Sequence, residues 1–191
     1  KYLNEEIIIS RSGYTGEDGF EISIPNLIAK DIIKLLLNNK LTNLCGLGCR
    51  DSLRLEAGLS LYGNDLNEEI SPIDANLRWA LDKDRLTDKK LNGNDIIKFQ
   101  FLNGSNKKKV GLISSSNFIL RSNMKLINKN NEEIGIITSG GFSPCLKLSI
   151  GIGYLYSPTF INEQIFSLIR GKNEKIDLVN LPFVKHNYLK G

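Results

Sequence analysis

The sequence has few of the residues that build disulfide frameworks, zinc sites and histidine-based catalytic pairs. Among its 191 residues are three cysteines and one histidine, His186. An odd number of cysteines without a framework spacing suits a reducing compartment. Cys45 and Cys49 are not followed by a second ligand pair, which argues against a structural zinc site. A Ser–His or Cys–His catalytic pair would have to use His186 near the C-terminus, so we expect none.

Long hydrophobic runs are also lacking. The longest apolar stretch lies within Asn26–Asn39 and is interrupted by charged residues, so it predicts an amphipathic helix and not a membrane span. The net charge is +4, which fits a solvated surface or an anionic ligand. The one basic run, Lys107–Lys109, has no interleaved aromatic residues. We therefore expect neither a membrane nor a nucleic acid as a partner.

Two blocks, Ser10–Ile24 and Gly46–Asn64, place glycine-rich turns beside charged residues. In the first block, three glycines separate the strand-like segments Glu5–Arg11 and Phe20–Ile24. Glycine permits a positive φ or the close approach of a ligand to the backbone. Alternation along Phe20–Ile24 places Glu21 on the face opposite the apolar residues. By itself, this pattern fits a solvent-facing carboxylate.

The second block predicts a helix that begins near Arg50 and ends at Gly58, since glycine is common just after a helix C-terminus. Arg54 could form a surface ion pair with Asp51 or Glu56. Arg50 is harder to explain, because the helix dipole disfavours a cation at the N-terminal end by about 0.3–1 kcal/mol. Its position there is a hint of a specific partner.

The C-terminal half has a different pattern. Trp79, the only tryptophan, is expected in a hydrophobic core. The polar segment Asn103–Lys109 is the expected loop between the two parts of the chain. Six short strands separated by turn signals follow, at spacings typical of a small β-barrel or sandwich. They are Val110–Ser114, Met124–Asn128, Ile134–Ser139, Leu146–Tyr154, Gln164–Arg170 and Lys175–Val179.

Several long motifs, in the same order, resemble the aminomethyltransferase family, the T-protein of the glycine cleavage system. Three of them resemble the later part of its folate-binding core and three its C-terminal barrel. They are GYTGEDGFEI (Gly13–Ile22), RDSLRLEAGLSLYGNDL (Arg50–Leu66) and SPIDANLRWALDK (Ser71–Lys83), then VGLI (Val110–Ile113), GIITSGGFSPCLKLSIGIGYL (Gly135–Leu155) and PFVKHNY (Pro182–Tyr188).

The resemblance implies an α+β fold. Residues 1–100 would be the C-terminal portion of a discontinuous folate-binding core, and residues 101–191 a small antiparallel β-barrel domain. The implied reaction passes a one-carbon unit from the aminomethyl-lipoyl arm of the H-protein to tetrahydrofolate and releases ammonia. It implies tetrahydrofolate as co-substrate, no metal, and the lipoylated H-protein as partner. The implied compartment is the mitochondrial matrix in a eukaryote and the cytoplasm in a bacterium.

Three positions correspond to binding residues of the family. Glu21 resembles the carboxylate that holds the pterin, where an ionised carboxylate would accept from adjacent N–H groups. Arg50 resembles the substrate-binding arginine, which could meet a carbonyl or carboxylate of the ligand or fix Glu21. Tyr188 resembles the C-terminal tyrosine that closes over the folate, with a ring face and a hydroxyl to offer.

The sequence also departs from the family, whose members are about twice as long. The family's catalytic aspartate lies in an N-terminal half that we expect this chain to lack, and Asp18, Asp51 and Asp65 do not lie in its motif. We therefore assign no catalytic residue, and we expect exposed apolar strands. The alternatives are a folate-binding module without the reaction, the folate domain of a sarcosine or dimethylglycine dehydrogenase-like protein, and a partner-binding domain without ligand.

Overall fold

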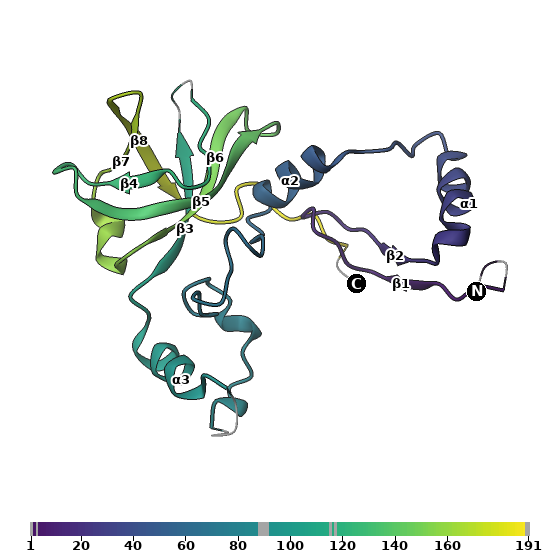
Figure 1. Ribbon diagram of the computed structural model, residues 1–191, viewed down its shortest axis with the longest axis horizontal. Helices are drawn as coiled ribbons and strands as arrows, with labels where there is room; N and C mark the ends of the chain where they lie inside the picture. The colour runs from purple at the N-terminus through teal and green to yellow at the C-terminus, as the bar shows by residue number, and fades with distance from the viewer. Residues whose placement is uncertain (1, 3, 88–91, 115, 117, 190–191) are drawn as a thin grey trace.

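The computed structural model describes residues 2, 4–87, 92–114, 116 and 118–189. Figure 1 shows an open molecule in which a β-barrel, an arm and a smaller helical part meet near the C-terminal end of helix α2. None of the helices in the described residues combines the length and apolarity that crossing a membrane requires.

The arm consists of a two-stranded antiparallel ribbon and one helix. Strand β1 (Ile8–Ser10) pairs with β2 (Glu21–Ser23), with Ile9 opposite Ile22. Helix α1 (Asn26–Leu37) follows Pro25 and confirms the predicted amphipathic helix. All six strand residues are exposed, so the exposed apolar strands expected from the sequence are also confirmed.

Helix α2 (Leu47–Glu56) leads from the arm to the barrel. It begins three residues earlier than predicted, so Arg50 lies in its first turn. Its end is as predicted. Gly58 adopts a φ of +68°, and its N–H donates to the Leu55 carbonyl while the N–H of Leu59 donates to that of Arg54. This pair of hydrogen bonds is a Schellman motif, which satisfies the last helix carbonyls.

The barrel is closed and antiparallel, with neighbouring strands in the order β3-β6-β5-β4-β7-β8. All six predicted strands are present, and together with the helices they confirm the α+β class. Their bounds are β3 (Lys108–Ser114), β4 (Lys125–Ile127), β5 (Glu133–Ser143), β6 (Leu148–Leu155), β7 (Ile165–Ile169) and β8 (Lys172–Val179), with the short helix η3 (Pro158–Asn162) before β7.

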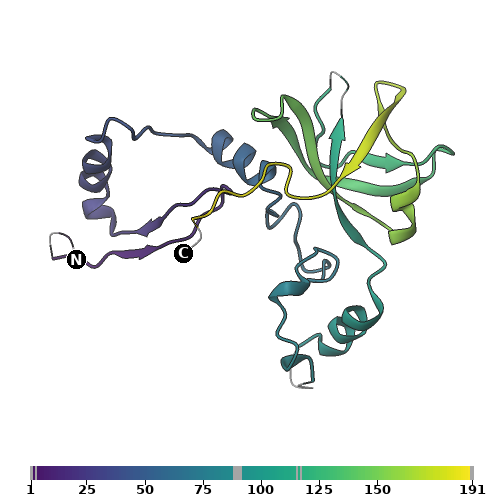
Figure 2. The same cartoon turned by 180° about the vertical axis from the view of Figure 1, so that it is seen from behind.

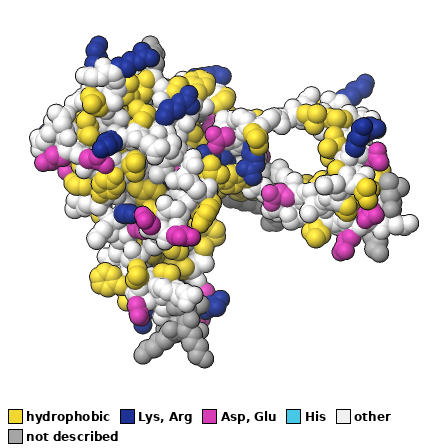
Figure 3. Space-filling model, viewed as in Figure 1, with side chains coloured by type: hydrophobic (Ala, Val, Ile, Leu, Met, Phe, Trp, Pro, Cys, Tyr) yellow, Lys and Arg dark blue, Asp and Glu magenta, His cyan; other side chains and the backbone are white. Residues whose placement is uncertain are grey.

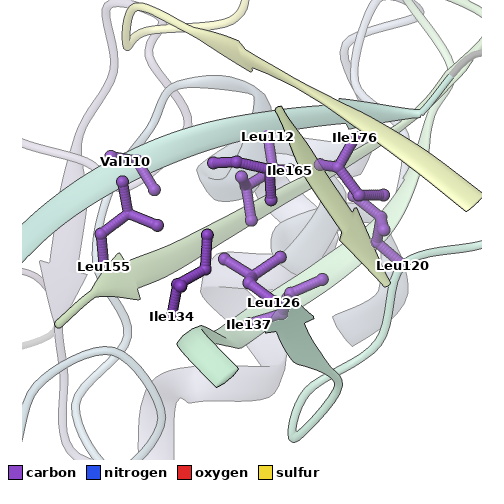
Figure 4. Close-up of a cluster of buried hydrophobic side chains, with 9 residues drawn as sticks. All are labelled: Val110, Leu112, Leu120, Leu126, Ile134, Ile137, Leu155, Ile165 and Ile176. Carbon is purple, nitrogen blue, oxygen red and sulfur yellow. The ribbon is translucent and has the colours of Figure 1, made fainter. Parts of the chain in front are cut away.

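Leucine, isoleucine and valine side chains fill the barrel interior (Figure 4). Every strand contributes at least one of them, because alternate residues of each strand point inward. A smaller cluster joins Leu55 of α2 to Ile150 and Ile152 of β6. Burial of these side chains fixes the C-terminal end of α2 on the outside of the barrel.

The helical part lies between α2 and β3 along the chain. It holds the short helices η1 (Arg78–Ala80) and η2 (Arg85–Thr87) and helix α3 (Asn94–Asn103). The prediction of a buried Trp79 is wrong: its side chain is 82% exposed, because the three-residue helix that carries it leaves it uncovered. The division of the chain at residues 1–100 and 101–191 stays a prediction.

Candidate functional site

The glycine-rich loop between β1 and β2 closes on itself through its charged side chains. Arg11 donates to both carboxylate oxygens of Asp18, from Nε to Oδ1 and from Nη2 to Oδ2, each at 3.0 Å. Paired hydrogen bonds of this kind fix the relative orientation of the two groups. Asp18 therefore holds the loop together.

Glu21 is the first residue of β2 and lies at the end of this loop. Ser12 donates to its Oε2 at 2.6 Å, and the carboxylate is exposed. Ser12 and Ser10 also share a hydrogen bond of 2.8 Å. Ser12 of the loop thus holds the Glu21 carboxylate and leaves it accessible.

Arg50 packs against the same loop from α2. Its guanidinium carbon lies 4.8 Å from the centroid of the Tyr14 ring, a distance at which a cation is attracted to the ring face. The Tyr14 hydroxyl donates to the Ser60 carbonyl. Burial raises the pKa of Tyr14, opposed by the charges of Arg54 and Arg50. The specific partner that the helix position of Arg50 suggested is thus an aromatic ring.

The C-terminal segment reaches the loop from the barrel and passes beside α2 (Figure 2). The N–H of Asn187 donates to the Gly16 carbonyl at 2.8 Å, and the N–H of Asp18 donates to the Asn187 carbonyl at 3.3 Å. Asn187 also donates from its side chain to Glu17 Oε2 at 2.9 Å. These bonds place the next residue, Tyr188, at the edge of the loop.

Tyr188 is partly exposed, and its ring centroid lies 5.1 Å from that of His186 with the planes tilted by 51°. His186 in turn donates from Nε2 to the Ala57 carbonyl at 2.8 Å. The only histidine is therefore engaged in joining the C-terminal segment to α2. This packing holds the segment that carries Tyr188 against α2.

The backbone of the glycine-rich loop comes very close to the end of α2, where the loop, the helix and the C-terminal segment meet. Gly16 adopts a φ of +78°, and a Cβ added to it would lie 2.8 Å from the Ala57 Cβ. Only glycine fits such a position without displacement of its neighbour. The loop that holds Glu21 and contacts Arg50 and the Tyr188 segment thus depends on Gly16.

The structure brings the three predicted residues around one loop but does not join them to each other. Within the described residues, no ion pair links Glu21 to Arg50. The alternative in which Arg50 fixes Glu21 has no direct contact behind it among the described residues, where Arg50 rests on Tyr14 and Ser12 donates to Glu21. Their role as binding residues stays a prediction.

An open cavity of about 1100 Å³ borders this loop on the side of the barrel. Its lining includes Tyr14, Trp79, Lys109 and His186. Glu21, Arg50 and Tyr188 are not among the lining residues, so Tyr14 and His186 lie between the cavity and the predicted site. The cavity and the site therefore share two side chains.

Lys109 is a buried charged residue of the cavity lining that sequence reasoning missed. Its Nζ donates to Ser60 Oγ at 2.6 Å and to the Gly58 carbonyl at 3.2 Å, and the side chain is buried. Burial lowers the pKa of Lys109, partly opposed by the charge of Asp65. Its place in a run of three lysines concealed this role. Alternation along β3 places Lys109 on the face opposite Val110 and Leu112, so it points out of the barrel, where Gly58 and Ser60 meet it.

The prediction that Arg54 forms its ion pair at the surface is wrong. Arg54 is buried, and it pairs with Asp51 at 2.7 Å and with Asp65 at 2.9 Å. Glu56 is buried as well and accepts from Ser143 Oγ and from the N–H of Cys145. Both charged residues face the barrel, because the last turn of α2 packs against it.

In the described part of the chain, no group of three or more histidine, cysteine, aspartate or glutamate residues could hold a metal ion. The three cysteines are free and exposed. Hydrogen bonding to Cys45 raises the pKa of the Cys49 thiol, which disfavours its thiolate.

Two family models match the chain. The GCVT N-terminal domain matches residues 2–85, and the glycine cleavage T-protein C-terminal barrel domain matches residues 107–185. The mitochondrial aminomethyltransferase of Flaveria pringlei is 45% identical over 188 residues, which are 95% of this chain and 45% of that protein. The mitochondrial aminomethyltransferase of Dictyostelium discoideum is 41% identical, over 97% of this chain and 48% of its own length.

A solved structure agrees with this assignment. The glycine cleavage system aminomethyltransferase T from Bartonella henselae is similar at a TM-score of 0.91 and 36% identity, over 96% of this chain and 51% of that protein. The chain thus spans about half the length of the relatives it matches. It belongs to the aminomethyltransferase family, the T-proteins of the glycine cleavage system.

Proposed function

We propose that this chain provides the tetrahydrofolate-binding residues of a glycine cleavage aminomethyltransferase. The observation that supports the proposal is the common anchor of three side chains: Glu21, Arg50 and the segment of Tyr188 all contact one glycine-rich loop. Groups that must meet one ligand are best placed by a shared rigid support.

The side chains suit the chemistry of a pterin and its substituents. Ser12 donates to one oxygen of Glu21, and the exposed carboxylate keeps acceptor capacity for the adjacent N–H groups of a pterin edge. Arg50 rests its flat face on Tyr14, so its N–H groups remain available to a carbonyl or carboxylate of the ligand. The exposed ring of Tyr188 offers a face for the bound molecule to pack against.

In this function, tetrahydrofolate, when bound, supplies the nitrogens that receive the one-carbon unit. The residues of this chain bind and orient it, and no catalytic residue is assigned to them. The lipoylated H-protein would deliver the aminomethyl group and ammonia would be released. The compartment would be the mitochondrial matrix in a eukaryote and the cytoplasm in a bacterium.

Titration of the 191-residue chain with tetrahydrofolate under anaerobic conditions tests the proposal. We expect weak binding by the unaltered chain, and a Kd about tenfold to a hundredfold higher for Glu21→Gln, since a hydrogen bond to a charged group contributes about 1.5–3 kcal/mol. Glu163→Gln, an exposed carboxylate near the barrel, is the matched control and should leave the Kd unchanged. Equal affinity of the Glu21→Gln variant and the unaltered chain would refute the assignment.

The transfer reaction itself is expected to be absent in the chain alone, because the family's catalytic aspartate belongs to the half that it does not span. An assay with aminomethyl-lipoyl H-protein and tetrahydrofolate should release no ammonia above background. Full transferase activity from the purified 191-residue chain would contradict this expectation.

A further inference from the structure

Two of the three free cysteines lie beside each other at the start of α2. Cys45 precedes the helix by two residues, and Cys49 is the third residue of the helix. Their thiols share a hydrogen bond, so the two sulfur atoms lie close together. Both cysteines are free and exposed. The pair lies just before the family motif that begins at Arg50, and no part of the candidate site uses it.

The segment that carries the pair is open to solvent. Every residue from 41 to 50 is exposed, and the space-filling view shows an opening through the arm beside the segment that leads into α2 (Figure 3). A Cβ added to Gly46 or to Gly48 would meet nothing within 4 Å. A small reagent can therefore reach both sulfur atoms, and the backbone beside them has room to adjust.

The first turn of α2 keeps the two cysteines at a short separation. The N–H groups of Cys49 and Arg50 both donate to the Gly46 carbonyl, at 3.1 and 3.4 Å. These bonds hold Cys49 one helical turn away from the residue next to Cys45. A disulfide requires an S–S length of about 2.05 Å and side chains that point toward each other, as two thiols that share a hydrogen bond do. Gly46 separates Cys45 from the helix, and its conformational freedom can absorb the remaining adjustment.

We propose that Cys45 and Cys49 are a redox-modification site, at which a small-molecule disulfide oxidises the two thiols to an intramolecular disulfide across the first turn of α2. Oxidised glutathione represents this class of reagent. Exposed disulfides are the ones that reductants reverse most easily, so the modification is reversible in a reducing compartment. The proposal concerns two sulfur atoms and one helical turn, and it does not depend on tetrahydrofolate binding or on the transfer reaction.

The reaction is thiol–disulfide exchange in two steps. The Cys45 thiolate attacks one sulfur of oxidised glutathione, breaks its S–S bond and releases one glutathione thiolate, which leaves a mixed disulfide on Cys45. The Cys49 thiolate then attacks the Cys45 sulfur and releases the second glutathione thiolate. The two cysteines together lose two electrons and two protons. Oxidised glutathione takes up both electrons, and the two glutathione thiolates take up the protons.

The hydrogen bond between the thiols decides which cysteine attacks first. Bonding to Cys45 raises the pKa of the Cys49 thiol, so Cys49 keeps its proton and Cys45 is the attacking sulfur, since the thiolate is the nucleophile. Once Cys45 carries the mixed disulfide, it no longer accepts a hydrogen bond as a thiolate. Cys49 can then lose its proton and resolve the mixed disulfide.

Intact-mass spectrometry after incubation with oxidised glutathione tests the site. The 191-residue chain with Cys145→Ser keeps only the pair, and the substitution leaves the backbone bond from residue 145 to Glu56 in place. This variant should lose the mass of two hydrogen atoms, stay monomeric and regain its mass with dithiothreitol. Adding Cys45→Ser or Cys49→Ser to it should give a stable glutathione adduct in place of the disulfide. The adduct should form faster on Cys45 than on Cys49.

Hydrogen exchange of the same Cys145→Ser chain gives a second measurement. The amides of Cys49 and Arg50 should exchange more slowly in the oxidised form than in the reduced form, because the disulfide spans the turn that their hydrogen bonds close. Amides of the barrel should be unchanged. Thiols that stay unreacted, a stable glutathione adduct in place of the disulfide, or a disulfide between two copies of the chain would each overturn the proposal. So would unchanged exchange at the first turn of α2.

Discussion

The Arg54 guanidinium and the Asp65 carboxylate form an ion pair, 2.9 Å between Nη1 and Oδ2, in which both side chains are almost fully buried. Ser139 of β5 donates to the same Asp65 oxygen, and Thr138 donates to the other. Consecutive residues of a regular strand point to opposite faces, but the register shifts between Ile137 and Ser139. This β-bulge allows both hydroxyls to reach Asp65.

Asp65→Asn should strongly destabilise the chain. The substitution removes the buried counter-ion of Arg54 and leaves only Asp51, whose side chain is 60% exposed, and breaking a buried pair costs about 3–5 kcal/mol. Urea unfolding followed by circular dichroism measures the change. Asp177→Asn removes the partner of an exposed pair with Lys175 on β8 and should leave the free energy of unfolding unchanged within error. Similar losses for the two variants would contradict this account of Asp65.

The barrel could be predicted from the sequence because its signals are local. Each strand shows alternation or an apolar run bounded by turn residues. These signals alone fit a barrel or a sandwich, and the family resemblance indicated the barrel. The end of α2 could be predicted for the same reason, since Gly58 directly follows the helix. The burial of Arg54 could not, because its partners Asp65 and Ser139 lie 11 and 85 residues further along the chain.

The candidate site was predictable only in part. The family motifs named Glu21, Arg50 and Tyr188, but their contacts with Ser12, Tyr14 and the Gly16 loop arise from the packing of three distant segments. Trp79 shows that the average burial of a residue type does not determine the burial of one residue. Tryptophan is usually well buried, yet the described residues leave this side chain 82% exposed, and the sequence around it gives no sign of this.

Because of Lys109, the free energy of unfolding should change with pH in the alkaline range. Burial lowers its pKa in the folded state from the ordinary value of 10.5. Between the two pKa values the unfolded chain binds more protons, so the free energy of unfolding rises with pH across that window. We expect the unaltered chain to gain stability relative to Lys109→Met as pH rises from neutral to 10.5, measured by urea unfolding at each pH. A constant difference between the two would contradict the prediction.

Tyr14 should affect ligand binding through its ring more than through its hydroxyl. Tyr14→Leu removes the face on which Arg50 rests, and an exposed cation–π contact contributes about 0.5–1 kcal/mol. Tetrahydrofolate should then bind about twofold to fivefold more weakly in titration of the chain. Tyr14→Phe keeps the ring and loses only the bond to Ser60, so its affinity should stay near that of the unaltered chain. The reverse order of the two variants would assign the role to the hydroxyl.

Gly16→Ala should disrupt the junction that joins the loop, α2 and the C-terminal segment. An alanine here would adopt an unfavourable positive φ and place its Cβ against Ala57, and strain of this kind costs about 1–3 kcal/mol. Gly19→Ala is the matched control in the same loop, because its Cβ would meet nothing within 4 Å and its φ needs no glycine. Gly16→Ala should have a lower melting temperature and a weaker affinity for tetrahydrofolate than the unaltered chain. Both quantities should be nearly unchanged for Gly19→Ala. If Gly16→Ala lowered stability but left the Kd for tetrahydrofolate unchanged, the loop would not be the support of the binding site.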